Sequence, residues 1–277
     1  TNYLDHAYFF IRDEPQPAYY DLITSVAQLI HSVNSSVKIM ETMNQELSTY
    51  PDDFLEEVDH YCMHIHEWHP SQAYPDDDTV DKWPTRLKTF LDTYSGPREK
   101  SLWIYHTHNR FPTPDTDIYM SGMLQRSMLW LHWIYNVDTY LYWSFNWATD
   151  MSEGYGYASY GESNLVGFGE DDEPLSSLRL ERIRDGIEDY EYFWILNDTC
   201  TQLENGGYSA ESVTGRNLLE QVSQTFNQPE YWSHMPNYES DDFEGFKWSY
   251  SPYAEDYLTL RDAIGEEITR IHSLSLL

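Results

Sequence analysis

A regular alternation of short apolar runs and longer amphipathic segments constrains the fold of this 277-residue chain more than any other feature. Each apolar run has the length and the aromatic or β-branched content of a strand, and the segments between them space their apolar residues as one face of a helix. The strand-like runs are 8–12, 36–40, 58–65, 101–105 and 137–145, and the helical segments are 17–33, 81–94 and 121–135. Strands that alternate with helices form parallel βαβ units, so the sequence predicts an α/β fold with a helix-covered parallel sheet.

The number of these units indicates part of a (β/α)₈ TIM-type barrel. The chain would supply the C-terminal portion, about strands 4 to 8, and the first three strands would come from another segment or another chain, because five strands cannot close a ring of eight. An open doubly wound sheet is the alternative architecture. No glycine-rich phosphate loop follows any strand-like run, so the sequence does not support dinucleotide binding. No other cofactor is predicted.

A long helical segment follows the last strand-like run and a loop rich in Gly, Tyr and Ser. It begins near Ser176, and Gly186 lies in its middle. A glycine there costs about 1 kcal/mol relative to alanine, so we expect Gly186 to mark close packing against a neighbour. The residues predicted to form the buried face of this helix are Leu180, Ile183, Ile187, Tyr190 and Trp194.

The remainder of the chain indicates a helical C-terminal extension. A last helix is predicted over residues 257–272, and residues 226–256, which are acidic, aromatic and without clear period, are predicted to form an ordered loop or insertion. The sequence therefore predicts two domains, a partial barrel over residues 1–200 and an extension over 201–277 that packs on it.

Charge and apolar content exclude several classes of partner. The formal net charge of −31 repels phosphate backbones and anionic lipid surfaces, so neither nucleic acid nor a membrane is an expected partner. No apolar run approaches the roughly 18 residues needed to span a bilayer.

Other sequence features bear on location and on the cysteines. The chain begins at Thr1 with no pattern of a signal peptide, which indicates that it starts inside something longer. Residues 34–36 and 197–199 fit the N-glycosylation pattern, and an extracellular or secretory-pathway location is expected. Cys62 and Cys200 are predicted to be buried thiols, although the sequence does not decide whether they pair.

Two adjacent carboxylates, Asp13 and Glu14, end the first strand-like run and precede Pro15. Residues at the C-terminal ends of parallel strands face the active site, and a carboxyl pair in a partly desolvated pocket is the equipment for glycoside hydrolysis. Successive strand residues point to opposite faces, so both acids can serve one pocket only if the chain turns as it leaves the strand. The alternative is a pair of ordinary solvated charges, because the same tripeptide recurs at residues 172–174.

A row of histidines is the second candidate site. His60, Cys62, His64 and His66 alternate along one strand-like run, a spacing that could bind zinc. Histidines of the core or in contact with substrate are the preferred interpretation, so no metal site is predicted. A metallohydrolase that uses His64, His66 and His106 stays open as a further alternative.

Aromatic residues crowd the expected ends of the strands. Sugars present flat C–H faces that stack on aromatic rings, while neighbouring polar side chains bind hydroxyl groups. The residues predicted to contact a sugar are Glu41, His66, Tyr105, Trp143, Asn146 and Trp147.

The chain also resembles a known family. The segment from Arg179 to Tyr192 fills every position of the pattern R-x-E-x-x-R-D-G-I-E-D-Y-E-Y, and it follows the sequence YWSFNWA and a glycine-rich loop. Upstream lie a strand ending in Asp-Glu-Pro, a W-x-Y strand at 103–105, and Arg126 and Trp130 in the next helical segment. Over about residues 8–200 the chain resembles glycoside hydrolase family 123 and the related domain of unknown function 4091.

This resemblance implies a (β/α)₈ barrel that removes terminal β-linked N-acetylgalactosamine, or more broadly N-acetylhexosamine, from glycans. The implied mechanism is retaining and substrate-assisted, with no metal and no enzyme nucleophile. Glu14 would be the general acid/base, and Asp13 would orient the 2-acetamido group that attacks the anomeric carbon. The alternative function is a non-catalytic carbohydrate-binding or structural assembly protein with a glycosidase-like barrel.

Overall fold

A computed structural model describes residues 7–43, 50–64, 91–96, 98–106, 122–143, 145, 165–168, 173–225 and 253–274. The chain divides into two compact units. One comprises residues 1–111 and 135–143, and the other comprises residues 112–134 and 144–277. The first unit carries the sheet and the second is mainly helical. The domain boundary near residue 200 stays a prediction, and a single helix runs through that position.

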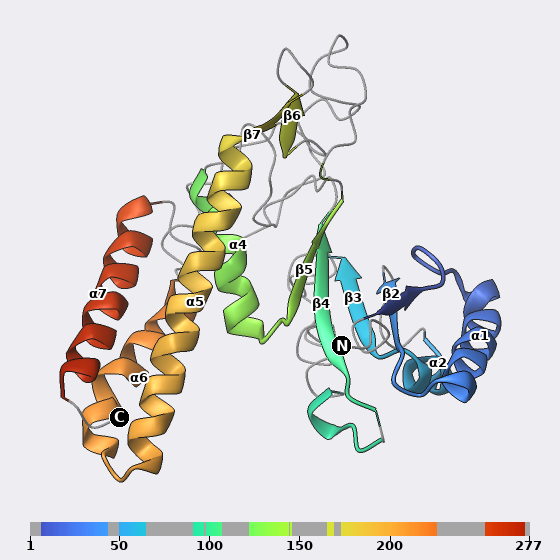
Figure 1. Ribbon diagram of the computed structural model, residues 1–277, viewed down its shortest axis with the longest axis horizontal. Helices are drawn as coiled ribbons and strands as arrows, with labels where there is room; N and C mark the ends of the chain where they lie inside the picture. The colour runs from blue at the N-terminus through green and yellow to red at the C-terminus, as the bar shows by residue number, and fades with distance from the viewer. Residues whose placement is uncertain are drawn as a thin grey trace, which may run out of the picture. The chain divides into compact units, whose positions relative to one another are not determined.

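Every strand that the sequence predicts is present in one parallel sheet (Figure 1). The strands are β1 (Tyr8–Phe10), β2 (Lys38–Met43), β3 (His60–His64), β4 (Ser101–His106) and β5 (Thr139–Tyr142). They lie in the order β1-β2-β3-β4-β5, and each pairs in parallel with the next. A doubly wound sheet reverses its strand order at a switch point, and the described strands show no such reversal. The sheet is therefore part of a (β/α)₈ barrel.

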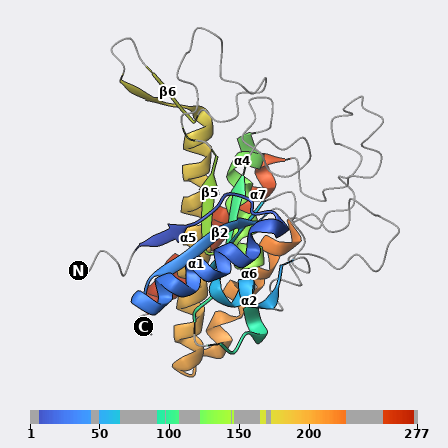
Figure 2. The ribbon, with the colours of Figure 1, turned by 90° about the vertical axis from the view of Figure 1, so that its right-hand side faces the viewer.

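The helices of the sheet unit are η2 (Pro17–Tyr19), α1 (Tyr20–Val33) and α2 (Asp52–Glu57). Both α-helices lie along one face of the sheet (Figures 1 and 2). Ile23 of α1, Phe54 of α2 and Ile39 of β2 are fully buried or nearly so, and the Tyr61 hydroxyl of β3 donates to the Leu55 carbonyl of α2. This face is the helix-covered face of the sheet.

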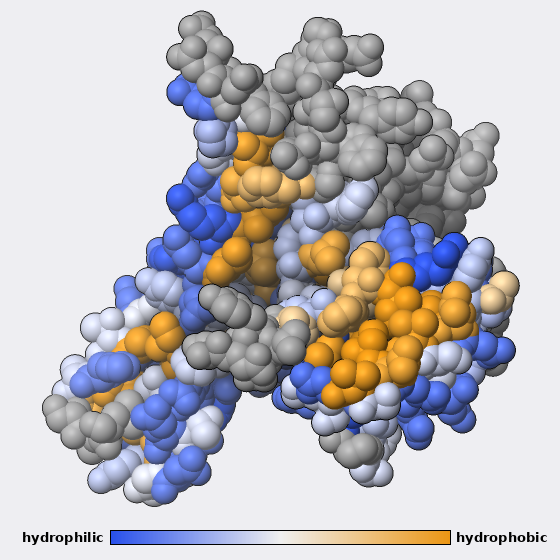
Figure 3. Space-filling view, turned by 45° about the vertical axis from the view of Figure 1, so that its right-hand side comes forward, coloured by the Kyte–Doolittle hydropathy of each residue, from blue (hydrophilic) through white to orange (hydrophobic). Residues whose placement is uncertain are grey.

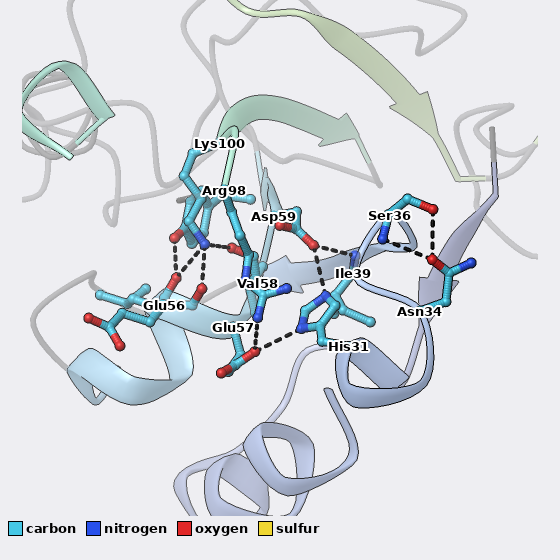
Figure 4. A network of polar contacts seen from close by, with 12 residues as sticks. His31, Asn34, Ser36, Ile39, Glu56, Glu57, Val58, Asp59, Arg98 and Lys100 are labelled. Carbon is cyan, nitrogen blue, oxygen red and sulfur yellow. Dashed lines mark hydrogen bonds and ion pairs between the residues drawn. The ribbon is translucent and has the colours of Figure 1, made fainter. Parts of the chain in front are cut away.

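A polar network holds the end of the sheet at which its strands begin (Figure 4). His31, in the last turn of α1, places Nδ1 2.8 Å from Glu57 Oε2, which also accepts a 2.6 Å hydrogen bond from Arg98 Nη2. Asp59 Oδ2 accepts the Ile39 N–H at 2.8 Å and lies 3.3 Å from His31 Nε2. At the same end, Lys100 Nζ donates to the carbonyls of Leu55, Glu56 and Val58, where a positive charge suits the end of a helix dipole.

The outer side of α1 differs from the prediction. The spacing of its apolar residues predicts one buried face, and Ile23 and Ala27 are indeed buried. Leu22, Leu29 and Val33 are exposed, with Val33 the most exposed of the three at 81%. The helix therefore carries a second apolar stripe that no described residue covers.

The second unit contains α4 (Gly122–Tyr135, its last residue in the sheet unit), α5 (Leu178–Asn205), α6 (Ser209–Gln224), α7 (Ala254–Ser273) and a small antiparallel hairpin, β6 (Val166–Phe168) and β7 (Pro174–Ser176). The sequence predicted α4, α5 and α7 but not α6. Buried side chains from the four helices share one core, which includes Trp130, Phe193, Leu219, Tyr257 and Ile264. Residues 226–252, most of the predicted insertion, lie outside the described residues.

Two residues of α5 fix its contact with α4. A Cβ atom at Gly186 would lie 2.4 Å from the Arg126 carbonyl oxygen, so only glycine permits this approach, as the sequence predicts. Asp189 is fully buried and accepts two 2.6 Å hydrogen bonds from Arg126 and one of 2.9 Å from Trp130 Nε1. Arg261 of α7 adds a contact of 3.2 Å to the same carboxylate.

The buried face of α5 matches the predicted one only in part. Ile183 is buried, but Ile187 and Trp194 are each about half exposed, at 48% and 52%. The face that packs in the core runs through Ile183, Gly186, Asp189, Phe193, Leu196, Cys200 and Leu203. Ser177 begins the helix by accepting the Leu180 N–H at 3.2 Å, close to the predicted start.

Among the described residues, no helix combines the length and apolar character needed to cross a bilayer.

The buried carboxylate of α5 predicts a large effect on stability. Asp189→Asn removes the charge that partners Arg126 and leaves a cation without its counter-charge, so we expect a loss of about 3–5 kcal/mol in the free energy of unfolding. Arg184 on the same helix forms an exposed ion pair with Glu181, and Arg184→Ala should cost less than about 1 kcal/mol. Urea unfolding followed by circular dichroism measures both, and equal losses would contradict this role of Asp189.

Candidate active site

The two adjacent acids lie on a turn that follows β1. The strand ends at Phe10, and the chain bends at residues 13 and 14. The backbone of Glu14 has φ = +42°, in the left-handed region that costs a residue other than glycine about 1–2 kcal/mol. Strain of this kind persists where surrounding contacts impose it, and it concentrates at functional sites. The turn that the sequence required for a shared pocket is therefore present.

A single hydroxyl group connects both acids to β2. Thr42 Oγ1 accepts the backbone N–H of Glu14 at 2.8 Å and donates to Asp13 Oδ1 at 2.9 Å. Thr42 lies near the C-terminal end of β2, where the active sites of parallel α/β folds are found. Sequence reasoning missed this residue, because only the pairing of β1 with β2 brings it beside the acids.

A tyrosine from β4 contacts the second acid. The Tyr105 hydroxyl donates to Glu14 Oε1. Burial, and then its bond to Glu14, raises the pKa of Tyr105, so the phenol stays protonated and remains a donor. Tyr105 was predicted to contact a sugar, and the structure places it directly against the candidate catalytic carboxylate.

Thr42 and Tyr105 lie on the same face of the sheet. Thr42 pairs in register with Cys62, Cys62 pairs with Trp103, and Tyr105 is two residues beyond Trp103. Both contacts of the acids therefore come from one face and from the C-terminal ends of two different strands. Asp13 is exposed and Glu14 is partly buried. The structure thus directs the two adjacent side chains to one side of the sheet.

The histidines of β3 belong to an aromatic layer on this face. His60 stacks on Trp103 with ring centroids 4.8 Å apart, and its Nδ1 lies 2.5 Å from Ser101 Oγ. The His64 ring meets the Tyr105 ring edge-on at 4.6 Å. Among the described residues, no group of three or more metal-ligating side chains comes together. His66 and the side chain of His106 lie outside the described residues. Cys62 and Cys200 are buried free thiols, as predicted.

Glu41 is in a different place from the one predicted. The sequence put it among the residues that bind sugar hydroxyls. In the structure it pairs in register with Tyr61, so it lies on the helix-covered face, where it is fully buried. Its oxygens accept the backbone N–H groups of Ile11 at 3.0 Å and Arg12 at 3.3 Å. A carboxyl group buried in this way has no surface on which to meet a sugar.

The other predicted sugar contacts are only partly visible. Trp143 follows the last residue of β5 and is about half exposed. Asn146 and Trp147 lie outside the described residues, as do the loops that immediately follow β2, β3 and β4. A hollow of about 720 Å³ lies instead in the helical unit, between α5 and α7, where Tyr192 and Arg261 line it. The candidate active site is therefore at Asp13 and Glu14, and not in that hollow.

Glu41 predicts a measurable dependence of stability on pH. Burial raises the pKa of Glu41 to about 8, although its two backbone hydrogen bonds lower it. The folded state therefore keeps a proton that the unfolded state releases above its ordinary pKa of 4.5, and stability should fall as pH rises toward 8, by at most about 1.4 kcal/mol per pH unit.

Between pH 6.5 and 8 the difference between the wild type and Glu41→Gln isolates this effect, because burial also lowers the pKa of Lys100 from 10.5 to about 8 and makes stability rise as pH approaches 8. Burial lowers the pKa of His60 from 6.5 to about 4, so His60 makes stability rise with pH below 6.5 and opposes Glu41 there. Urea unfolding at several pH values should show the slope between 6.5 and 8 in the wild type and in Glu173→Gln, whose side chain is exposed. The fall in stability with rising pH should be absent in Glu41→Gln, and a fall that survives there would assign it to another group.

Comparison with known proteins identifies the family of the chain. A family model described as the glycoside hydrolase 123 catalytic domain matches residues 1–196. Among solved structures, a glycoside hydrolase family 5 mannosidase from Rhizomucor miehei is similar, with 11% identity and a TM-score of 0.32 over 66% of this chain and 51% of that chain. The chain thus spans about half the length of that enzyme, and no curated protein matches it significantly. Since the family model covers well over half of the sequence, the chain belongs to glycoside hydrolase family 123.

Proposed function

We propose that this protein hydrolyses terminal β-linked N-acetylgalactosamine, or a related N-acetylhexosamine, by a retaining and substrate-assisted mechanism. Glu14 is the general acid/base and Asp13 orients the acetamido group of the sugar. The observation that carries the proposal is the placement of both acids on one side of the sheet, where Thr42 and Tyr105 hold them. Membership of a glycoside hydrolase family supports the same reaction class.

In the first step, the acetamide carbonyl oxygen of the sugar attacks the anomeric carbon as the bond to the leaving oxygen breaks. Glu14 gives its proton to that oxygen, so the leaving group departs as an alcohol. Asp13 accepts a hydrogen bond from the acetamide N–H and stabilises the positive charge that develops on the cyclic intermediate. Because the nucleophile belongs to the substrate, the protein needs no second carboxylate on the opposite side of the anomeric carbon.

In the second step, water attacks the anomeric carbon from the face that the leaving group vacated, and Glu14 takes a proton from that water. The carbon–oxygen bond of the intermediate breaks and the acetamide is restored. Two inversions leave the product with its original β configuration. Trp143 offers a half-exposed ring on which a sugar can stack, and His66, Asn146 and Trp147 complete the proposed sugar contacts.

Hydrolysis of a β-N-acetylgalactosaminide tests this proposal. General acid catalysis contributes about 10²- to 10⁴-fold, so Glu14→Gln should lose that much in kcat on a disaccharide, whose leaving group is poor, and less on a nitrophenyl glycoside. Asp13→Asn should lose activity on both substrates. The matched control is Glu173→Gln, which changes the equivalent residue of the second Asp-Glu-Pro tripeptide and should leave activity unchanged.

Two further measurements separate the mechanism from its rivals. A β-galactoside, which has a hydroxyl in place of the acetamide, should not be cleaved, and a thiazoline analogue of N-acetylgalactosamine should inhibit competitively. Equal cleavage of the galactoside would contradict substrate assistance. If the wild type binds N-acetylgalactosamine but hydrolyses no glycoside, the alternative of a non-catalytic carbohydrate-binding or assembly protein replaces the enzyme.

We also propose that further strand–helix units, from the same polypeptide or another chain, complete the barrel beside β1. Strand β1 pairs only with β2 in the described sheet, and its three aromatic residues are each about half exposed. The apolar stripe of α1 lies exposed in the same unit, and Figure 3 shows hydrophobic side chains gathered there. A parallel sheet is ordinarily covered on both faces, so an added strand and its helix would bury both features.

The stripe on α1 provides a test of this completion. In the 277-residue chain alone, Leu29→Lys with Val33→Lys should lower the fluorescence of the hydrophobic dye ANS, because the exposed apolar surface shrinks. Gln28→Lys with Ser32→Lys adds the same charge at exposed polar positions of α1 and should leave the fluorescence unchanged.

A chain that includes the completing units should respond differently. There the Leu29 and Val33 replacements should lower the free energy of unfolding by about 1.5–3 kcal/mol each, since they would then be buried. An equal response of both double variants in that longer chain would contradict a covered stripe.

The net charge of −31 supports our proposal that neither nucleic acid nor an anionic membrane is a partner. We propose that the protein is located in the extracellular space or the secretory pathway, where its two N-glycosylation tripeptides could be modified. No cofactor takes part in the proposed mechanism.

A further inference from the structure

Side chains, and not the sheet ladder, hold the turn that carries Asp13 and Glu14. The ladder between β1 and β2 ends with the pairing of Phe10 and Met40. The next two backbone N–H groups, of residues 11 and 12, both donate to the carboxyl group of Glu41, at 3.0 and 3.3 Å. Glu41 thus accepts the backbone hydrogen bonds of residues 11 and 12, beyond the last paired residue of β1.

The second contact to the turn comes from the next residue of β2. Adjacent residues of a strand point to opposite faces, so Glu41 reaches the turn from the helix-covered face and Thr42 reaches it from the other. Thr42 Oγ1 binds the backbone N–H of Glu14 and the carboxylate of Asp13. The chain that leaves β1 is therefore held from both faces as it crosses the end of β2.

We propose that Glu41 and Thr42 are positioning residues that together set the geometry of the Asp13–Glu14 pair. This inference rests on the proposed function, since it names the residues that prepare that site for catalysis. Neither side chain meets the substrate. Glu41 fixes where the turn begins, and Thr42 fixes the backbone of the acid/base and the carboxylate of its neighbour.

Backbone geometry explains why such a clamp is needed. A non-glycine residue with φ = +42° returns to an ordinary conformation unless its neighbours prevent it. In addition, the Thr42 hydroxyl donates to the Asp13 carboxylate while its oxygen accepts the backbone N–H of Glu14, so one group fixes both residues of the pair. Catalytic groups that lie 1 Å from their proper place can lose about 10²-fold in rate.

Conservative variants separate the two contributions. Thr42→Val keeps the shape of the side chain and removes both hydrogen bonds, whereas Thr42→Ser keeps the hydroxyl. Glu41→Gln keeps one acceptor oxygen but points an amide N–H₂ group at the other backbone donor. The matched control is Thr139→Val in β5, a threonine of the same sheet that is partly exposed, whereas Thr42 is buried.

Hydrogen exchange of the backbone amides, measured by NMR, tests the clamp without any need for activity. In Thr42→Val the amide of Glu14 should exchange at least 10-fold faster, and in Glu41→Gln one of the amides of Ile11 and Arg12, the one that then faces the N–H₂ group, should do so. Thr42→Ser and Thr139→Val should keep the wild-type rates at all three amides. Unchanged exchange at these amides in both Thr42→Val and Glu41→Gln would overturn the proposal.

Kinetics then distinguish a positioning role from a merely structural one. On the disaccharide substrate, Thr42→Val and Glu41→Gln should lower kcat by about 10- to 100-fold with KM changed less than 3-fold, and Thr42→Ser should restore most of kcat. A rise in KM alone would assign these residues to binding and overturn the positioning role. If the wild type hydrolyses nothing, the proposed function fails, and the exchange rates still decide whether the clamp exists.

Discussion

Two adjacent carboxylates can act on one substrate only where the chain has left its strand, because consecutive strand residues point to opposite faces. The structure meets this constraint by ending β1 at Phe10 and by bending the chain across the end of β2. Thr42 then binds both acids from one face while Tyr105 contacts the second of them. The site therefore depends on the parallel pairing of β1 with β2, which sets the residues that lie beneath the turn.

The pattern of apolar residues predicted most strands and helices correctly, but it predicted poorly which helix faces are buried. All five strands were predicted because apolar and aromatic runs of that length have few other conformations available. The buried faces of α1 and α5 were mistaken in part, because periodicity shows that a helix has an apolar face but not whether a partner covers it. Val33 and Trp194 are apolar residues that remain exposed among the described part of the chain. Helices α2 and α6 were missed, since their few apolar residues are diluted by polar ones.

The site shows the same division between what is local and what is not. Asp13, Glu14 and Tyr105 were identified because strand ends and acidic pairs are visible in the sequence, and the structure brings these three together. The roles of Thr42 and Glu41 depend on the register between neighbouring strands, which the sequence of one strand does not determine. A shift of β2 by one residue would exchange their faces and put a carboxyl group where the hydroxyl now binds Asp13.

The two Asp-Glu-Pro tripeptides of the chain make the final point about what creates a site. In the first, Pro15 is buried, Glu14 has a left-handed backbone, and side chains of β2 and β4 contact the acids. In the second, Glu173 is exposed and Pro174 begins an exposed strand of a two-stranded hairpin. The residues are identical, so their chemistry in isolation is identical. Their environments differ because each tripeptide lies beside a different strand. At the C-terminal end of a parallel sheet, side chains of other strands can contact the acids, and a small hairpin has no such strands.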